Sequence, residues 1–132
     1  MNPAATATDR YVLTTDLRDD PGVAETYREY HANVPAEVTR SFSEAGIREL
    51  EVYLLGRRLV MIVEIDRGLD LDRAFRRHAS SHPRVAEWEA LMARLQRPIG
   101  DAPRGEWWAR MERVCRIAGP SAADGRRPPV PA

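Results

Sequence analysis

The feature that most restricts the fold of this chain is a pair of strand-like segments joined by three residues. Residues 47–55 and 59–66 are rich in aliphatic and β-branched side chains, and residues 56–58, Gly-Arg-Arg, form a connection of hairpin length between them. The second segment begins Leu-Val-Met-Ile-Val-Glu-Ile, which is apolar at every position except Glu64. A strand this apolar is covered on at least one face, so we expect it at the centre of a sheet.

The segment before the hairpin predicts a strand followed by a broken helix. Apolar side chains alternate over residues 11–17, and residues 19–22, Asp-Asp-Pro-Gly, are typical of a turn that enters a helix. Large side chains then recur every three or four residues from Val23 to about Ala45, which predicts an amphipathic helix. Pro35 must kink or restart this helix, because proline has no backbone N–H to donate.

The segment after the hairpin completes an α+β pattern. It predicts helices over 71–79 and 83–95, a loop over 98–105 and a last strand over 107–117. This order of elements is that of a ferredoxin-like domain, a four-stranded antiparallel sheet with helices on one face. The other face is then uncovered, and a small chain usually buries such a face against a second copy of itself. We therefore expect a symmetric homodimer.

Length and the composition of the two ends predict one folded domain. A chain of 132 residues suits a single domain. Residues 1–8 have few large apolar side chains, and residues 119–132 end Gly-Arg-Arg-Pro-Pro-Val-Pro-Ala. We expect both ends to be disordered, which leaves residues 9–118 as the domain.

Charge and composition argue against several kinds of partner. The formal net charge is zero, because 20 arginines balance 20 acidic residues and lysine is absent, so no basic field exists to hold a nucleic acid. No apolar run approaches the roughly 20 residues that a membrane-spanning helix needs. The single cysteine, Cys115, has no partner for an internal disulfide. We expect a cytoplasmic chain without nucleic-acid or membrane partners.

The usual signatures of metal and cofactor sites are not found in this sequence. His78 and His82 have the four-residue spacing of a metal pair, but Ser80, Ser81 and Pro83 interrupt the helix that would aim both rings, and no third ligand is apparent. Patterns for a serine-hydrolase elbow, a zinc ribbon, a phosphate loop and a dinucleotide site are also missing. We therefore expect neither a metal nor a cofactor.

The first predicted helix carries the side chains best suited to proton transfer. Tyr27 and His31 are four residues apart and share the face that also carries Val34 and Val38. An imidazole on this face is either a core histidine satisfied by backbone carbonyls or a proton donor and acceptor in a pocket. Spacing alone leaves both interpretations open.

Three other side chains pose the same choice. Trp88 lies on the apolar face of the last predicted helix and is either a core residue or a platform for the C–H face of a sugar ring. Glu89 beside it is either a solvated position at the edge of that face or a ligand contact. Glu64 is either a strand-end carboxylate that reaches water or a hydrogen-bond acceptor in a pocket.

Four segments of the chain together resemble the bacterial L-rhamnose mutarotase family, and more closely its L-fucose mutarotase branch. They are LTTDLRDDPGVAETYREYH, EVYLLGRRLVMIVEID, HPRVAEWEALMARLQRPI and WWARMERVCRI, which cover nearly all of residues 9–117. The resemblance implies a ferredoxin-like domain of the dimeric α+β barrel type. It also implies a cofactor-free isomerase that interconverts the α and β anomers of a 6-deoxyhexose, L-fucose or L-rhamnose.

The resemblance extends to individual residues. The general acid/base histidine of the family falls on His31, its substrate-contacting tyrosine on Tyr27 and its sugar-contacting tryptophan on Trp88. Glu89 stands where rhamnose-type members carry a second tryptophan, as it does in fucose-type members. Tyr53 matches a tyrosine that the family has on the same strand.

Two points about the site stay open at this stage. A carboxylate is expected to bind a sugar hydroxyl or to serve as the second proton site, and both Glu89 and Glu64 are candidates. Family members usually have Trp-Pro-Glu shortly after the histidine, whereas this chain reads Pro-Ala-Glu at residues 35–37.

Two other functions are compatible with the sequence. The same scaffold hosts small oxygenases and haem-degrading enzymes, so an oxidoreductase is one alternative. A non-catalytic sugar-binding module is the other, because the tryptophan that the family usually carries after its histidine is missing.

Overall fold

The computed structural model describes residues 7–119. The expectation that the two ends are disordered falls largely on residues 1–6 and 120–132, which lie outside the described residues. The elements in chain order are β1 (Thr8–Leu17), α1 (Val23–Ala32), α2 (Ala36–Glu44), β2 (Ile47–Leu55), β3 (Arg58–Asp66), α3 (Leu71–Ala79), α4 (Pro83–Leu95), β4 (Gln96–Arg97) and β5 (Ala109–Arg110).

The strands form one antiparallel sheet in the order β2-β3-β1-β4, with β5 also paired to β1. The β3 strand pairs with β1 from Thr8 opposite Asp66 to Asp16 opposite Arg58, and with β2 on its other side. The short strands β4 and β5 share the outer edge of β1. This order, with the fourth position divided between two pieces, confirms the predicted ferredoxin-like α+β class.

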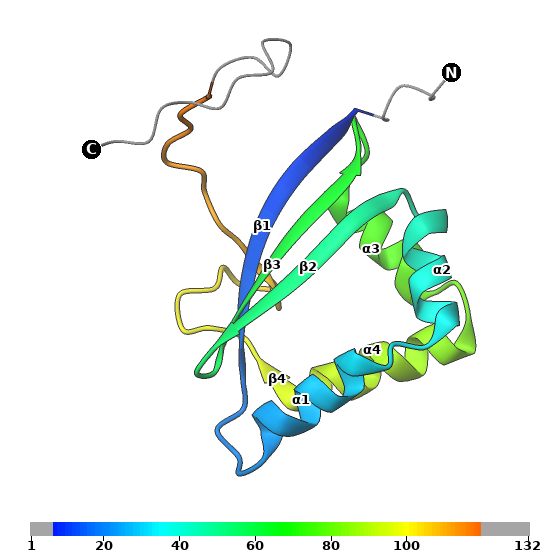
Figure 1. Cartoon of the computed structure of the whole chain (residues 1–132), viewed down its shortest axis with the longest axis vertical. Coiled ribbons are helices and arrows are strands. Elements are labelled where there is room, and N and C mark those ends of the chain that lie inside the picture. The colour runs from blue at the N-terminus through cyan, green and yellow to red at the C-terminus, as the bar shows by residue number, and fades with distance from the viewer. Residues whose placement is uncertain (1–6, 120–132) are drawn as a thin grey trace.

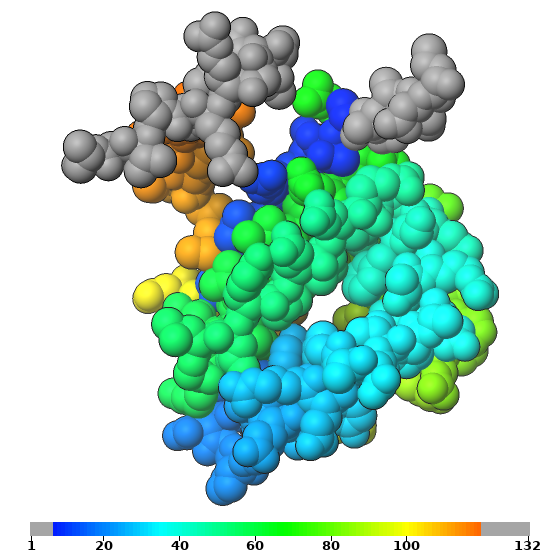
Figure 2. All heavy atoms as spheres, viewed as in Figure 1, coloured from blue at the N-terminus to red at the C-terminus, as the bar shows by residue number. Residues whose placement is uncertain are grey.

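The four helices of the described chain cover one face of the sheet (Figure 1). Strand alternation decides which side chains face them: Leu59, Met61, Val63 and Ile65 of β3 are buried, whereas the residues between them are half-buried on the other face. The space-filling view is hollowed between β2 and the helices α1 and α2 (Figure 2). None of the helices in residues 7–119 is both long and apolar enough to cross a bilayer.

The helix predicted from Val23 to about Ala45 is divided as expected at Pro35. Helix α1 ends at Ala32, and Pro35 caps the start of α2, where its carbonyl accepts the backbone N–H of Val38 at 3.0 Å. Gly46 then turns the chain into β2 with a φ of +90°, a conformation that glycine adopts without steric cost.

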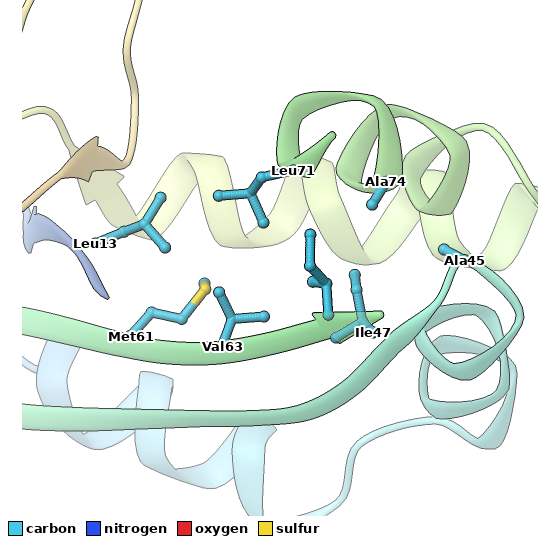
Figure 3. Packing of buried hydrophobic residues seen from close by; sticks show 8 residues of the cluster. Leu13, Ala45, Ile47, Met61, Val63, Leu71 and Ala74 are labelled. Carbon is cyan, nitrogen blue, oxygen red and sulfur yellow. The ribbon is translucent and has the colours of Figure 1, made fainter. Parts of the chain in front are cut away.

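Apolar side chains fill the space between the sheet and the helices. One cluster packs β1, β2 and β3 against α3 and includes Leu13, Met61, Val63, Leu71 and Ala74 (Figure 3). A second cluster packs the other end of the sheet against α1, α2 and α4. Its buried members are Leu17, Tyr27, Val38, Leu59, Val85, Trp88 and Met92.

The predicted strand over 107–117 is wrong in extent. Only Ala109 and Arg110 are in a strand, and the Met111 N–H donates a last hydrogen bond to the Val12 carbonyl at 2.7 Å. The chain then leaves β1, and residues 111–119 are exposed (Figure 1). Alternating apolar residues show that a segment could lie half-buried in a sheet. They do not show whether a neighbouring strand is there to pair with it.

Replacing Leu17 by alanine is expected to lower the free energy of unfolding by about 2–5 kcal/mol, because its side chain is 1% exposed and the truncation leaves a void. Urea denaturation followed by circular dichroism measures the change. Leu55, which is 85% exposed, is the matched control, and its replacement by alanine should change the value by less than about 0.5 kcal/mol. Equal losses in the two variants would contradict the described packing.

Candidate active site

A cavity of about 660 Å³ lies between the sheet and the helix layer. Helices α1, α2 and α4 line it on one side, and strands β2 and β3 line it on the other, at the hollow visible in Figure 2. Most of its wall is apolar. Polar and aromatic side chains gather at one part of the wall: Tyr27, His31, Trp88, Glu89 and Gln96.

A backbone hydrogen bond fixes the tautomer of His31. Its Nδ1 lies 2.8 Å from the carbonyl oxygen of Tyr27, one helical turn earlier. A carbonyl oxygen can only accept, so Nδ1 carries the hydrogen, and Nε2 of the neutral ring has a free lone pair. Nε2 has no hydrogen-bond partner within residues 7–119, and His31 lines the cavity. The backbone carbonyl thus satisfies one ring nitrogen and leaves the other as a base.

Aromatic rings surround His31 on two sides. The Tyr27 ring stacks on the imidazole with a centroid distance of 4.1 Å, and the Trp88 ring meets it edge-on at 5.3 Å. This burial lowers the pKa of His31, although the bond to the Tyr27 carbonyl acts in the opposite direction. The imidazole is therefore neutral, and able to accept a proton, at neutral pH.

The phenol of Tyr27 is held in its protonated form. Its side chain is 5% exposed, and burial, partly offset by a bond from Gln96, raises its pKa to about 12. The Gln96 amide nitrogen donates to the phenol oxygen at 3.4 Å, while the Gln96 carbonyl accepts the indole N–H of Trp107 at 3.0 Å. An indole N–H can only donate, so it sets the orientation of the amide. The phenol oxygen accepts from Gln96, and its own hydrogen has no acceptor among the described residues.

The carboxylate of Glu89 joins this group from α4. Its Oε1 lies 3.0 Å from Nε2 of His78, and its side chain is 43% exposed. Its negative charge contributes to raising the pKa of Tyr27, which indicates that the carboxylate and the phenol share one electrostatic environment.

Tyr53 and Glu64 lie on the other face of the sheet. On β2 the neighbours Val52 and Leu54 line the cavity, so the side chain of Tyr53 points the opposite way, where its hydroxyl donates to Glu51 at 2.7 Å. Glu64 on β3 accepts from the Thr8 hydroxyl at 3.2 Å and lies 3.6 Å from Arg10. The structure therefore does not bring these two candidates together with His31.

Two residues beside the site were missed as functional candidates. Gln96 follows Met92 by four residues and so continues the apolar face of α4 with a polar side chain. His78 follows Ala74 by four residues on α3 in the same way, but we considered it only as half of a metal pair. Polar residues on an apolar face were the available signal in both cases.

The two histidines with the spacing of a metal pair, His78 and His82, have separate contacts. His82 Nδ1 accepts the backbone N–H of Arg84 at 3.0 Å and caps the start of α4, whereas His78 faces Glu89. Within residues 7–119 no group of three or more His, Cys, Asp or Glu side chains could hold a metal ion.

The cavity thus combines groups suited to general acid/base chemistry. It presents an imidazole with a free lone pair, a protonated phenol, a carboxylate and an indole within one space. Such a set can exchange protons with two oxygen atoms of a small polar ligand while an aromatic face supports its C–H groups.

Comparison with known proteins identifies a matching family and two relatives. The family model described as L-rhamnose mutarotase matches residues 10–117. The L-fucose mutarotase of Xanthomonas campestris is 38% identical over 110 residues, which cover 82% of this chain and 86% of that protein. A UPF0734 protein of Dictyostelium discoideum is 35% identical over 107 residues, which cover 79% of this chain and 86% of that protein.

A solved structure shares the fold. The crystal structure of an L-rhamnose mutarotase from Formosa agariphila superposes with a TM-score of 0.58 at 16% identity and covers 83% of this chain and 99% of that one. Because the family match extends over nearly the whole described domain, the chain belongs to the L-rhamnose mutarotase family.

Proposed function

We propose that this chain is a cofactor-free mutarotase that interconverts the α and β anomers of a 6-deoxyhexose, L-fucose or L-rhamnose, with His31 as its proton-transferring residue. Family membership supports the class of enzyme, an isomerase acting on a sugar. The observation that carries the mechanism is the free Nε2 of His31, which faces a cavity that also holds a protonated phenol and a carboxylate.

Mutarotation requires two proton transfers and no net change in composition. A base takes the proton of the anomeric hydroxyl while an acid gives a proton to the ring oxygen, and the bond between the ring oxygen and the anomeric carbon breaks. The open aldehyde rotates, and the reverse transfers close the ring as the other anomer. Positioned acid and base groups contribute about 10²–10⁴ in rate, which suits a reaction that already proceeds in water.

The side chains around the cavity fit distinct parts of this reaction. In our proposal His31 transfers the proton, and the Tyr27 hydroxyl positions the sugar through a hydrogen bond to one of its oxygens. The indole of Trp88 supports the C–H face of the ring. Glu89 binds a sugar hydroxyl or is the second proton site, since Glu89, unlike Glu64, lines the cavity.

L-fucose is the first sugar to test. The relative from Xanthomonas campestris that is 38% identical to this chain is an L-fucose mutarotase. Glu89 also occupies the position that, by resemblance, separates fucose-type from rhamnose-type members.

The uncovered face of the sheet supports a homodimer as the working form. Val12, Val60 and Ile62 point to this face and are only half-buried in the single chain. The exposed segment after β5 adds two apolar side chains, Val114 at 88% and Ile117 at 90% exposure. We propose that a second copy of the chain covers these groups.

His31→Ala is expected to abolish the acceleration of anomer exchange, because it removes the base. Saturation-transfer NMR on L-fucose and L-rhamnose measures exchange in the presence and absence of protein. The matched control is His82→Asn, which changes a histidine outside the cavity and keeps a side-chain acceptor at the start of α4. Exchange by His31→Ala at the rate of the unchanged protein would refute the assignment.

The rate of exchange should rise with pH through a midpoint below the ordinary histidine value of about 6.5. Burial lowers the pKa of His31, and the neutral ring is the active base, so activity is lost as the pH falls through that lowered pKa. Trp88→Ala should expose the ring and move the midpoint back towards about 6.5. The profile is measured by the same NMR method after subtraction of the protein-free rate, and a midpoint above the ordinary value would contradict the assignment.

Sedimentation velocity at micromolar concentration should give the mass of two chains, because the open face buries its apolar side chains in a dimer. Ile62→Glu should shift the protein to the mass of one chain, since a carboxylate cannot be buried there without a partner. Glu87→Gln, a change at an exposed position of α4 on the helix side of the sheet, is the control for altered charge. A stable monomer of the unchanged protein would exclude the homodimer.

A further inference from the structure

A hydrogen-bonded chain of polar side chains, Ser81–Ser41–His78, leads through the helix layer to Glu89. His78, on α3, is 1% exposed and stacks on Phe42 with a centroid distance of 3.7 Å. Its Nε2 lies 3.0 Å from Glu89 Oε1, and its Nδ1 lies 2.8 Å from the hydroxyl of Ser41 on α2. The Ser41 hydroxyl in turn lies 2.6 Å from that of Ser81. Three helices therefore contribute to one connected chain of hydrogen bonds that ends at the cavity.

We propose that His78, held by Ser41, is a positioning residue that fixes Glu89 as the second proton site opposite His31. This inference rests on the proposed mutarotase function. One carboxylate oxygen of Glu89 is occupied by His78, and Glu89 lines the same cavity as His31 and Tyr27. The second carboxylate oxygen is then the one that faces the sugar.

The hydrogen-bond geometry keeps this arrangement in both protonation states of His78. In the neutral ring, Nε2–H donates to Glu89 and Nδ1 accepts the hydrogen of the Ser41 hydroxyl. In the charged ring, Nδ1–H donates to the Ser41 oxygen, whose own hydrogen turns to Ser81 at 2.6 Å. The Ser81 hydroxyl donates to the His78 carbonyl at 2.8 Å. Only the hydrogens of the ring and the hydroxyls change place, and the heavy atoms stay where they are. The Nε2–H of His78 therefore donates to Glu89 in either state, and this bond can persist while the carboxylate gains and loses a proton.

Ser41 has no access to the ligand. It is buried and does not line the cavity, although its neighbour Phe42 does. The order of contacts, a hydroxyl on Nδ1 and a carboxylate on Nε2, directs the imidazole towards Glu89. The hydrogen-bonded chain therefore orients the carboxylate and does not create a serine nucleophile.

Two variants of His78 separate positioning from simple filling of the core. His78→Phe keeps a flat ring against Phe42 but cannot donate to Glu89. His78→Gln brings an amide N–H near the place of Nε2 and restores the donor. We expect His78→Phe to lower kcat/KM for anomer exchange by about 10- to 100-fold, mainly through kcat, and His78→Gln to recover most of it.

The decisive measurement repeats His78→Phe in a Glu89→Gln background. A residue that acts through Glu89 causes no further loss once the carboxylate is gone, whereas a structural residue lowers activity by the same factor in both backgrounds. His82→Asn, which alters the other histidine of this segment, should leave exchange unchanged. Equal losses in the two backgrounds, or full activity of His78→Phe, would overturn the proposal.

A spectroscopic readout covers the case in which His78→Phe does not fold. Imidazole ¹⁵N NMR of the unchanged protein should show a hydrogen on Nε2 of His78 whose resonance shifts in Glu89→Gln. A bare Nε2 would overturn the proposal without any activity assay.

Failure of the proposed function gives a different pattern. If the unchanged protein exchanges no aldose, the mutarotase assignment fails, and calorimetric binding of L-fucose replaces exchange in the same set of variants. A loss of affinity in His78→Phe that disappears in the Glu89→Gln background supports positioning of the carboxylate for ligand binding. An affinity unaffected by His78→Phe overturns it.

Discussion

The arrangement of the site depends on the backbone break at Pro35. Because proline has no N–H to continue the helical hydrogen bonds, α1 ends at Ala32 and α2 begins at Ala36. Helices α1 and α2 consequently run in different directions over the sheet (Figure 1). His31 on α1 and Phe42 on α2 line one cavity from these two directions.

The two imidazoles in the helix layer, His31 and His78, differ because their partners differ. The carbonyl that faces His31 can only accept, so it fixes one hydrogen and leaves the second nitrogen of that ring as a base. His78 instead lies between a carboxylate and a hydroxyl, and the hydroxyl can donate or accept. In our proposals the His31 ring exchanges a proton with a ligand, and the His78 ring holds the neighbouring carboxylate of Glu89 in place.

Sequence patterns predicted the elements well because alternation and helical spacing report local burial. The hairpin, the broken helix and the shared face of Tyr27 and His31 all follow from such patterns. The same alternation could have placed Tyr53 outside the cavity, since it lies between two inward-facing residues of β2. The contact of His78 with Glu89 could not be predicted, because it joins different helices and depends on how α3 and α4 pack. The extent of the last strand could not be predicted either, because it depends on how far the chain stays paired with β1, and residue spacing does not specify this.

Trp107 connects Tyr27, through Gln96, to the point where the chain departs from the sheet. Its indole donates to Gln96, and its carbonyl accepts the Thr15 hydroxyl at 2.9 Å. The two residues of β5 and the Met111 N–H then hold the backbone that follows against β1. Mechanical load on the segment beyond Met111 therefore reaches the phenol through one amide. We therefore expect a tag or linker attached at that end to disturb the candidate site, which favours the opposite terminus for surface coupling and fusion.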